Sequence, residues 1–303
     1  SDDYDTVSET RTITIESVQE SYTYNLSSGN NLISFAIQPY NNQSNLIVND
    51  YNWGSIENPI DNIFNPDQSE DIEMIIGAGV AASFVDGSWV GSLEQIKQTS
   101  GYWINSPYDG YEVNIFGYKM YQDYVWDLED LSGYNEQGFN ALIGYNCLSD
   151  VDINSALVHY DGQVTDFIGT GYAATYIDGV GWVGSLAEFE PNRAYWMASE
   201  GISEFYFDCS PAIVRESNSI DYLEPLDEIS FDQSTEQSFY FIENIEKDGE
   251  ELMITGDQWI VSYCNDEIVG SRQWLGEMID VPAMGNDGNE YSNGYCTVGD
   301  VPE

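Results

Sequence analysis

The side chains in this chain that could do chemistry form no recognisable catalytic arrangement. The single histidine, His159, has no second histidine with which to bind a catalytic metal, and neither a Gly-x-Ser-x-Gly nucleophile motif nor a Walker phosphate-binding loop occurs. The 53 acidic residues supply so many carboxylate pairs that no single pair indicates glycoside hydrolysis. We therefore expect a protein that is not an enzyme, with His159 in a structural role.

Two glycine-containing segments begin like phosphate-binding loops. Gly77 and Gly79 flank an alanine, and Gly169 and Gly171 flank a threonine. Neither segment continues to a third glycine or to a lysine, and no basic residue lies nearby in the sequence. We interpret both as places where backbones pack closely, because glycine has no Cβ.

Carboxylate and amide oxygens are ligands that suit calcium, and they gather in two predicted loops. Neither loop has the full spacing of an EF-hand, so a solvated turn remains the alternative. Calcium is the only cofactor that the sequence suggests. The candidate ligands are Asn286, Asp287, Asn289 and Glu290, with a second cluster at Asp152 and Asn154.

Aromatic residues fall into two groups. Tryptophans that recur at matching places in the chain are predicted to belong to the core, with sugar stacking as the alternative; these are Trp89, Trp103, Trp182 and Trp196. Aromatic residues that do not recur are candidates for a ligand-binding or partner-binding surface. These are Tyr108, Tyr111, Tyr121, Tyr124 and Trp126.

The four cysteines suggest two local disulfides. We expect Cys147 to pair with Cys209 and Cys264 with Cys296, which would require an oxidising compartment. Four buried free thiols are the alternative. No Cys-x-x-Cys spacing or histidine partner indicates a zinc site.

The clearest pattern in the chain is a duplication. Residues 76–93 match residues 168–186 in their order of Gly-x-Gly, Ala-Ala, Asp-Gly and Trp-Val-Gly-Ser-Leu, and a Tyr-Trp pair follows each segment. Upstream, Leu32-Ile-Ser-Phe aligns with Leu142-Ile-Gly-Tyr. The offset between copies is 110 residues upstream and 92 residues at the glycines, so the first copy is longer by 110 − 92 = 18 residues. We expect this extra length to form a long surface loop within residues 40–72.

Short apolar runs bounded by Gly, Asn and Asp predict strands and turns throughout the chain. We expect an all-β protein with minor short helices, built as tandem β-rich domains: two homologous repeats and a C-terminal β-sandwich-like unit. The segments 92–98 and 185–190 begin with serine, which can cap a short helix, and each predicts one helical turn. The expected divisions are N-terminal strands at 1–24, the first repeat at 25–126, the second repeat at 127–209, a linker at 210–237 and the C-terminal unit at 238–303.

The charge of the chain limits its partners. A formal net charge of −46 repels nucleic-acid phosphates and anionic lipid headgroups, so we expect neither as a partner. High ionic strength or divalent cations would screen this charge. The charge of the chain therefore indicates a saline environment outside the cell.

The motifs of the duplication resemble a duplicated extracellular module of uncharacterised surface proteins from marine bacteria and aquatic viruses. The resemblance lies in the order Asn-Leu-Ile-Ser-Phe, Ile-Gly-x-Gly-x-Ala-Ala, Trp-Val-Gly-Ser-Leu and Gly-Tyr-Trp-Ile. It extends to a C-terminal unit with Val269-Gly-Ser-Arg-Gln-Trp and Asp280-Val-Pro-Ala-Met-Gly-Asn-Asp-Gly. It implies a location outside the cell or on a virion surface and provides no catalytic residues. Because relatives continue into another strand, the C-terminal unit is expected to be incomplete.

Three functions are consistent with these observations. The first is a structural component of an extracellular or virion-surface assembly, such as a filament, fibre, capsid decoration or surface layer, associating with itself or with other surface proteins. The second is a calcium-assisted module for carbohydrate binding or adhesion, with glycans as ligands. The third is a non-catalytic appendage of a larger secreted enzyme.

Overall fold

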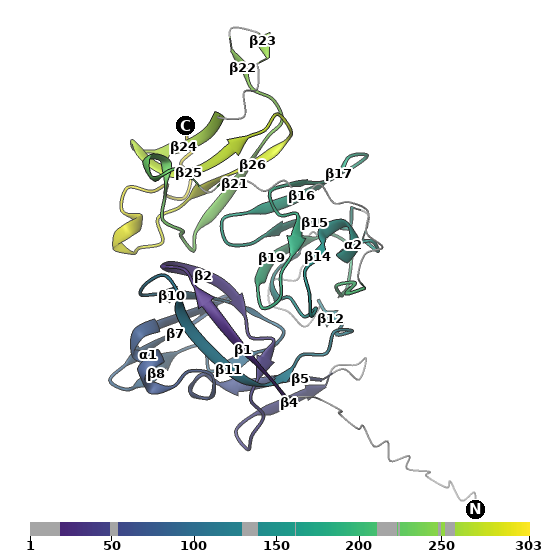
Figure 1. Cartoon of the computed structure of the whole chain (residues 1–303), viewed down its shortest axis with the longest axis vertical. Coiled ribbons are helices and arrows are strands. Elements are labelled where there is room, and N and C mark those ends of the chain that lie inside the picture. The colour runs from purple at the N-terminus through teal and green to yellow at the C-terminus, as the bar shows by residue number, and fades with distance from the viewer. Residues whose placement is uncertain are drawn as a thin grey trace, which may run out of the picture.

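The computed structural model describes residues 19–48, 54–128, 139–160, 162–210, 223, 225–247, 250–251 and 258–303. Antiparallel strands and short helices make up the structure, so the predicted all-β class is confirmed. Three units follow one another along the chain and from bottom to top in Figure 1. No helix in the described ranges is long and apolar enough to cross a lipid bilayer.

The first unit contains a five-stranded sheet in the order β2-β10-β6-β7-β8 and two three-stranded sheets, β1-β11-β3 and β4-β5-β9. In β11, alternate side chains are buried and exposed, as expected for a strand with one face on the core. The elements are β1 (Gln19–Leu26), β2 (Gly29–Ser34), β3 (Ile37–Gln38), β4 (Asn45–Val48), β5 (Gly54–Pro59), η1 (Ile60–Asn62), α1 (Pro66–Ile72), β6 (Met74–Gly77), β7 (Val80–Val85), β8 (Ser88–Gly91), β9 (Gln95–Lys97), β10 (Gly101–Ser106) and β11 (Tyr111–Lys119).

The second unit repeats this topology. Its five-stranded sheet has the order β13-β19-β15-β16-β17, strand for strand the order found in the first unit, and the pairs β12-β20 and β14-β18 complete it. The elements are β12 (Trp126–Asp127), β13 (Phe139–Gly144), β14 (Val151–Asp152), α2 (Ile153–Ala156), β15 (Val164–Ile168), β16 (Ala173–Ile177), β17 (Gly181–Gly184), β18 (Glu188–Phe189), β19 (Ala194–Ser199) and β20 (Glu204–Phe205).

The helical turns predicted after the Trp-Val-Gly-Ser motifs are wrong. These segments contain the short strands β9 and β18 instead. Tyrosines satisfy their amides: Tyr102 Oη accepts a hydrogen bond from the Lys97 amide at 2.8 Å, and Tyr195 Oη accepts one from the Glu190 amide at 3.0 Å. Each serine side chain accepts a bond from a neighbouring strand, so it does not cap a helix.

The extra segment of the first repeat is not the long loop that its composition predicted. Residues 40–72 contain β4, β5, η1 and α1. The Asn-Pro pair at residues 65–66, interpreted as part of a loop, begins α1: the Asn65 side chain accepts the Gln68 amide, and Pro66 occupies the first turn. In the second repeat, only β14 and α2 occupy the corresponding place.

The first repeat begins and ends at other residues than predicted. Residues 19–24 are not a separate N-terminal segment, because β1 pairs along its whole length with β11 of the first unit; residues 1–18 lie outside the described ranges. The first repeat ends before residue 126, because Met120, Tyr124 and Trp126 are buried in the core of the second unit.

The third unit is small and has its own core around Cys264, Val269 and Met284. Its elements are η2 (Asp227–Ile229), β21 (Gln237–Ile242), β22 (Glu246–Lys247), β23 (Glu250–Glu251), β24 (Gln258–Cys264), β25 (Glu267–Trp274), β26 (Ile279–Met284) and η3 (Glu290–Ser292). β24 and β25 form a hairpin, and β21 pairs with β26. Phe231 packs against this core, so the predicted linker at 210–237 includes part of the third unit; residues 211–222 and 224 lie outside the described ranges.

The two repeats pack against each other in an approximately two-fold arrangement. Leu32 and Trp103 of the first unit form one apolar cluster with Leu142 and Ala194 of the second. The backbone contacts occur twice with the roles of the repeats exchanged. Ile33 bridges to Arg193, and the matching Ile143 bridges to Ser100. Likewise the Ser34 amide donates to the Asn192 carbonyl at 2.9 Å, and the Gly144 amide donates to the Thr99 carbonyl at 3.0 Å.

Two glycines allow this close approach. A Cβ atom on Gly101 would lie 2.5 Å from the Cβ of Ala194, its counterpart in the other repeat. A Cβ on Gly144 would lie 2.7 Å from the Cβ of Ser34, which is likewise its counterpart. Real Cβ atoms do not come so close, so the interface requires glycine on one side of each contact.

Exchanging the glycine and alanine at this contact tests the arrangement. We expect Gly101→Ala to lower the free energy of unfolding by about 1–3 kcal/mol, because the added methyl group overpacks the interface. Ala194→Gly in the same chain should recover part of that loss, because it removes the opposing methyl group. Urea unfolding of the single and double variants measures both effects, and purely additive losses would contradict a direct contact.

Candidate functional site

The loop predicted as a calcium site, with Asn286, Asp287, Asn289 and Glu290, joins two units. Asp287 Oδ1 accepts hydrogen bonds from Ser292 Oγ at 2.8 Å and from the Asn289 amide at 3.1 Å, while Oδ2 accepts bonds from Tyr291 and Thr235. Tyr291 Oη in turn accepts a bond from Asn30 of the first unit. The loop thus holds the third unit against β2.

These protein donors use the carboxylate that a calcium ion would need. Burial alone would raise the pKa of Asp287, but the hydrogen bonds from Tyr291 and Ser292 outweigh it and lower the pKa below its usual value. Within the described ranges, no group of three or more His, Cys, Asp or Glu side chains is arranged to hold a metal ion. At the second candidate cluster, the Asp152 side chain caps α2. The calcium sites in both loops stay predictions, and what the geometry shows is the structural role of the Asp287 carboxylate.

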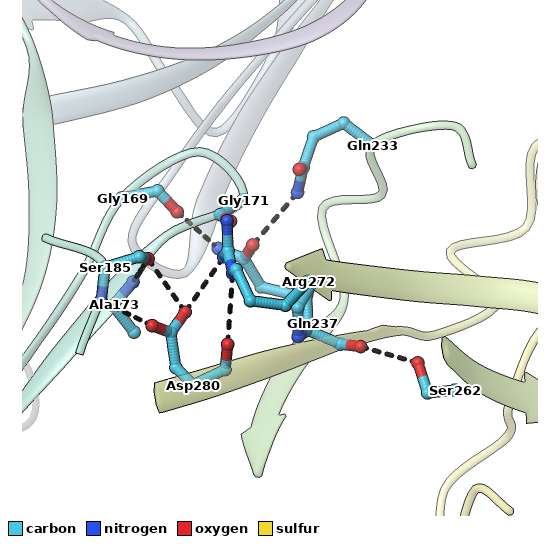
Figure 2. Close-up of polar contacts among 10 residues, drawn as sticks. Gly169, Gly171, Ala173, Ser185, Gln233, Gln237, Ser262, Arg272 and Asp280 are labelled. Atoms are coloured by element: carbon cyan, nitrogen blue, oxygen red, sulfur yellow. Dashed lines mark hydrogen bonds and ion pairs between the residues drawn. The ribbon is translucent and has the colours of Figure 1, made fainter. Parts of the chain in front are cut away.

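The second and third units meet at a buried ion pair (Figure 2). Arg272 Nη2 lies 2.9 Å from Asp280 Oδ2, and the Asp280 side chain is fully buried. The same carboxylate accepts hydrogen bonds from the amide and hydroxyl of Ser185 in the second unit. Arg272 also donates to the Gly171 carbonyl at 2.6 Å. A buried charge that is paired and fully hydrogen-bonded in this way fixes the relative position of two units.

The glycine segment at residues 169–171 contacts both other units. The Gly169 carbonyl accepts a bond from Gln237 of the third unit, and the Thr170 hydroxyl accepts one from the Leu32 amide of the first. These close backbone contacts agree with its interpretation as a packing site and not a phosphate site. The segment is the place where the three units meet.

The predicted aromatic surface does not exist as one surface. Tyr124 and Trp126 are buried in the core of the second unit, and Trp126 Nε1 donates to the Thr99 carbonyl at 3.0 Å. The sequence offered no sign of this, because both residues lie in a polar stretch that reads as a connection. Tyr121 is exposed, but β11 separates it from Tyr108 and Tyr111 by roughly 30 Å at about 3.3 Å per residue.

Tyr108 and Tyr111 do come together, in a hollow of about 380 Å³ beside α1. Their rings meet edge to face with centroids 5.4 Å apart. Tyr108 is 58% exposed, whereas Tyr111 is buried and donates through its hydroxyl to Asp71 Oδ2 at 3.0 Å. Burial and the neighbouring Asp71 carboxylate raise the pKa of Tyr111 well above its usual value, so the hydroxyl stays a donor.

Carboxylates surround this hollow. Asp67 and Asp71 reach it from α1, and Glu112 reaches it from the start of β11. Their oxygens accept hydrogen bonds, and the exposed ring of Tyr108 offers an apolar face. Together they suit a neutral ligand with many hydroxyl groups and repel an anion. The sequence pointed to the tyrosines but not to the carboxylates. With 53 acidic residues in the chain, nothing in the sequence distinguishes these three as part of a site.

The recurring tryptophans occupy packing positions of two kinds. Trp89 and Trp182 are partly buried against the cores of their own units. Trp103 is buried and Trp196 partly buried, and both belong to the cluster between the repeats.

The disulfides Cys147–Cys209 and Cys264–Cys296 are both present, which confirms the predicted pairing and leaves no free cysteine. The first closes the second unit and the second joins β24 to the C-terminal segment. Two disulfides indicate an oxidising, extracellular type of environment. Near the first disulfide, His159 Nε2 lies 3.4 Å from Asp208 Oδ2 on the surface of the second unit.

Comparison with known proteins places no relative beside this chain: no family model, no curated protein and no solved structure matches it. The resemblance to a duplicated extracellular module therefore stays a prediction.

Breaking the buried Arg272–Asp280 ion pair should cost much more stability than breaking an exposed ion pair. Arg272→Met leaves the Asp280 carboxylate buried without its cation, and we expect a loss of about 3–5 kcal/mol in the free energy of unfolding. Lys97→Met, the matched control, breaks the surface pair with Glu57 and should cost less than about 1 kcal/mol. Urea unfolding followed by tryptophan fluorescence measures both, and equal losses would contradict the assigned role of Asp280.

The Asp287 hydrogen bonds predict a specific pH dependence. Because its pKa is lowered in the folded state, Asp287 stabilises the fold above the ordinary carboxyl pKa of about 3.9, and this contribution is lost as the pH falls through the lower folded value. The deficit of Asp287→Asn relative to the unsubstituted protein should therefore be present near neutral pH and shrink as the pH falls below about 4. Unfolding free energies measured across this range test the prediction. Glu290→Gln, in the same loop, controls for the loss of a surface charge, and a deficit for Asp287→Asn that does not change with pH would contradict the prediction.

Proposed function

We propose that this protein is a non-catalytic structural component of an extracellular or virion-surface assembly. The observation that carries the proposal is the tight packing of the two repeats through Gly101 and Gly144, reinforced by the buried Asp280 at the next junction. A chain with these junctions behaves as one stiff body. Stiffness is what a filament, fibre, capsid decoration or surface layer requires of its subunits.

The disulfides and the charge support the same proposal. Cross-links that close the second unit and the C-terminal segment resist unfolding outside the cell. The net charge of −46 keeps separate copies soluble at low salt and allows them to approach when salt or divalent cations screen the repulsion. Assembly would then be favoured in a saline medium.

A second candidate function is the binding of a neutral carbohydrate in the Tyr108 hollow. The specific observation is an exposed tyrosine ring surrounded by the hydrogen-bond acceptors Asp67, Asp71 and Glu112. In the second repeat the corresponding elements are shorter, since α2 is shorter than α1 and β20 is shorter than β11. Adhesion through this hollow is compatible with a structural role.

Electron microscopy of native material with immunogold labelling tests the structural proposal. We expect gold on filaments, on particles or on a surface layer. Label confined to dispersed protein, with no assembled material, would contradict it.

A glycan array tests the second function. We expect Tyr108→Ala to abolish any binding that the unsubstituted protein shows, because it removes the stacking face of the hollow. Tyr121→Ala, which changes an exposed tyrosine at the other end of β11, should leave that binding unchanged. Repeating the array with a chelator shows whether calcium takes part. Equal binding by the two variants would exclude the hollow as the site.

A further inference from the structure

The outer side of β4 is an apolar strand edge that no described residue covers. β4 is the first strand of the β4-β5-β9 sheet, so it pairs with β5 on one side only. Leu46, Ile47 and Val48 are 41%, 44% and 50% exposed. Because successive side chains of a strand point to opposite faces, exposure of three in a row means that both faces of the strand are open. Figure 1 shows β4 and β5 at the end of the first unit farthest from the third.

This edge lacks the devices that usually block strand pairing. Proteins protect open edges with charged side chains, prolines or bulges, and β4 contains none of these. Residues 39–48 include no acidic or basic residue at all, although 53 of the 303 residues of the chain are acidic. The uncharged stretch coincides with the exposed edge.

The edge is also not needed to build the module. Among its described residues, the second repeat has the same five-stranded sheet without a counterpart of β4, because β4 lies in the longer segment of the first repeat. A strand that the fold can omit, and that leaves aliphatic side chains in water, gains from being covered. Burying such side chains is favourable in proportion to the apolar area removed from water.

We propose that β4 pairs antiparallel with β4 of a second copy of this chain across a two-fold axis, an interface that rests on the proposed structural function. Such pairing is self-complementary, because the same residues stand on both sides of the axis. It would join two three-stranded sheets into one continuous sheet by strand addition.

The distribution of charge favours a second copy of this chain as the partner of β4. A basic partner would bind the acidic surface and has no reason to choose an uncharged edge. A second copy carries the same −46 charge and is repelled wherever carboxylates face one another. At the uncharged edge of β4, two copies can meet without placing carboxylates against one another.

The short length of β4 determines how strong the contact between two copies can be. Four residues per copy bury less area than a stable dimer requires, so a single contact is weak and concentration-dependent. Many such contacts in one assembly add up, because each link raises the effective concentration of the next. Screening of the remaining repulsion makes salt strengthen the contact.

Sedimentation velocity over a concentration series tests the proposal, with Ile47→Asp as the edge variant and Val90→Asp as its control. Val90 is 61% exposed on β8, which is also the edge of a sheet, so both variants add the same charge at an exposed apolar edge position. We expect the unsubstituted protein and Val90→Asp to self-associate alike, and more strongly at about 1 M NaCl, where the Debye length is about 3 Å. Ile47→Asp should weaken this association about tenfold or more, because it places two carboxylates against each other.

Hydrogen exchange locates the contact. The amides of Asn45–Val48 should gain protection as the concentration rises, and those of Ser88–Gly91 should not. Equal association by Ile47→Asp and the unsubstituted protein, or a protein that stays monomeric at high salt and high concentration, would overturn the proposal. In either case, gold-labelled assemblies in native material would leave the structural function standing, with a different contact holding the copies together.

Discussion

At the centre of the molecule, two backbones approach more closely than side chains would allow. Gly101 lies against Ala194, and Gly144 lies against Ser34, so that β2 and β10 of one repeat reach β13 and β19 of the other. Each contact pairs one residue with its own counterpart, which is the property of a two-fold interface between identical partners. The two repeats therefore pack as one body and are not separate domains on a linker. The position of the third unit depends on this interface.

The third unit packs against both repeats. It contacts the second repeat through Asp280 and Arg272, and the first repeat through the hydrogen bond between Asn30 and Tyr291. Both contacts are possible only because the repeats present β2 and residues 169–171 side by side, where Thr170 accepts the Leu32 amide. The loop that contains Asp287 takes part in this contact, and its carboxylate accepts hydrogen bonds from Asn289 and Ser292.

The two repeats have the same sheet but different surroundings. The second is covered by the third unit at Ser185 and by the segment leading into β12, which buries Trp126. The first keeps an additional segment that forms both the α1 side of the Tyr108 hollow and the open edge of β4. The α1 side of the hollow and the open edge of β4 are therefore built by residues that the duplication did not copy, whereas copied residues form the interface between the repeats.

The all-β class, the duplication and both disulfides followed from the sequence alone, because strand alternation, Gly and Asp-Gly turns and paired cysteines are local signals that tertiary context did not override. The roles of individual side chains did not follow. Trp126 and Tyr124 looked exposed because nothing local shows that they belong to the core of the second unit. The hydrogen bonds of Asp287 could not be foreseen, because its donors Thr235 and Tyr291 come from elsewhere in the chain or around a turn. The tertiary structure decided these points because burial and hydrogen-bond satisfaction depend on residues far apart in sequence, and one chemical group serves as a ligand, a partner or a core contact according to what surrounds it.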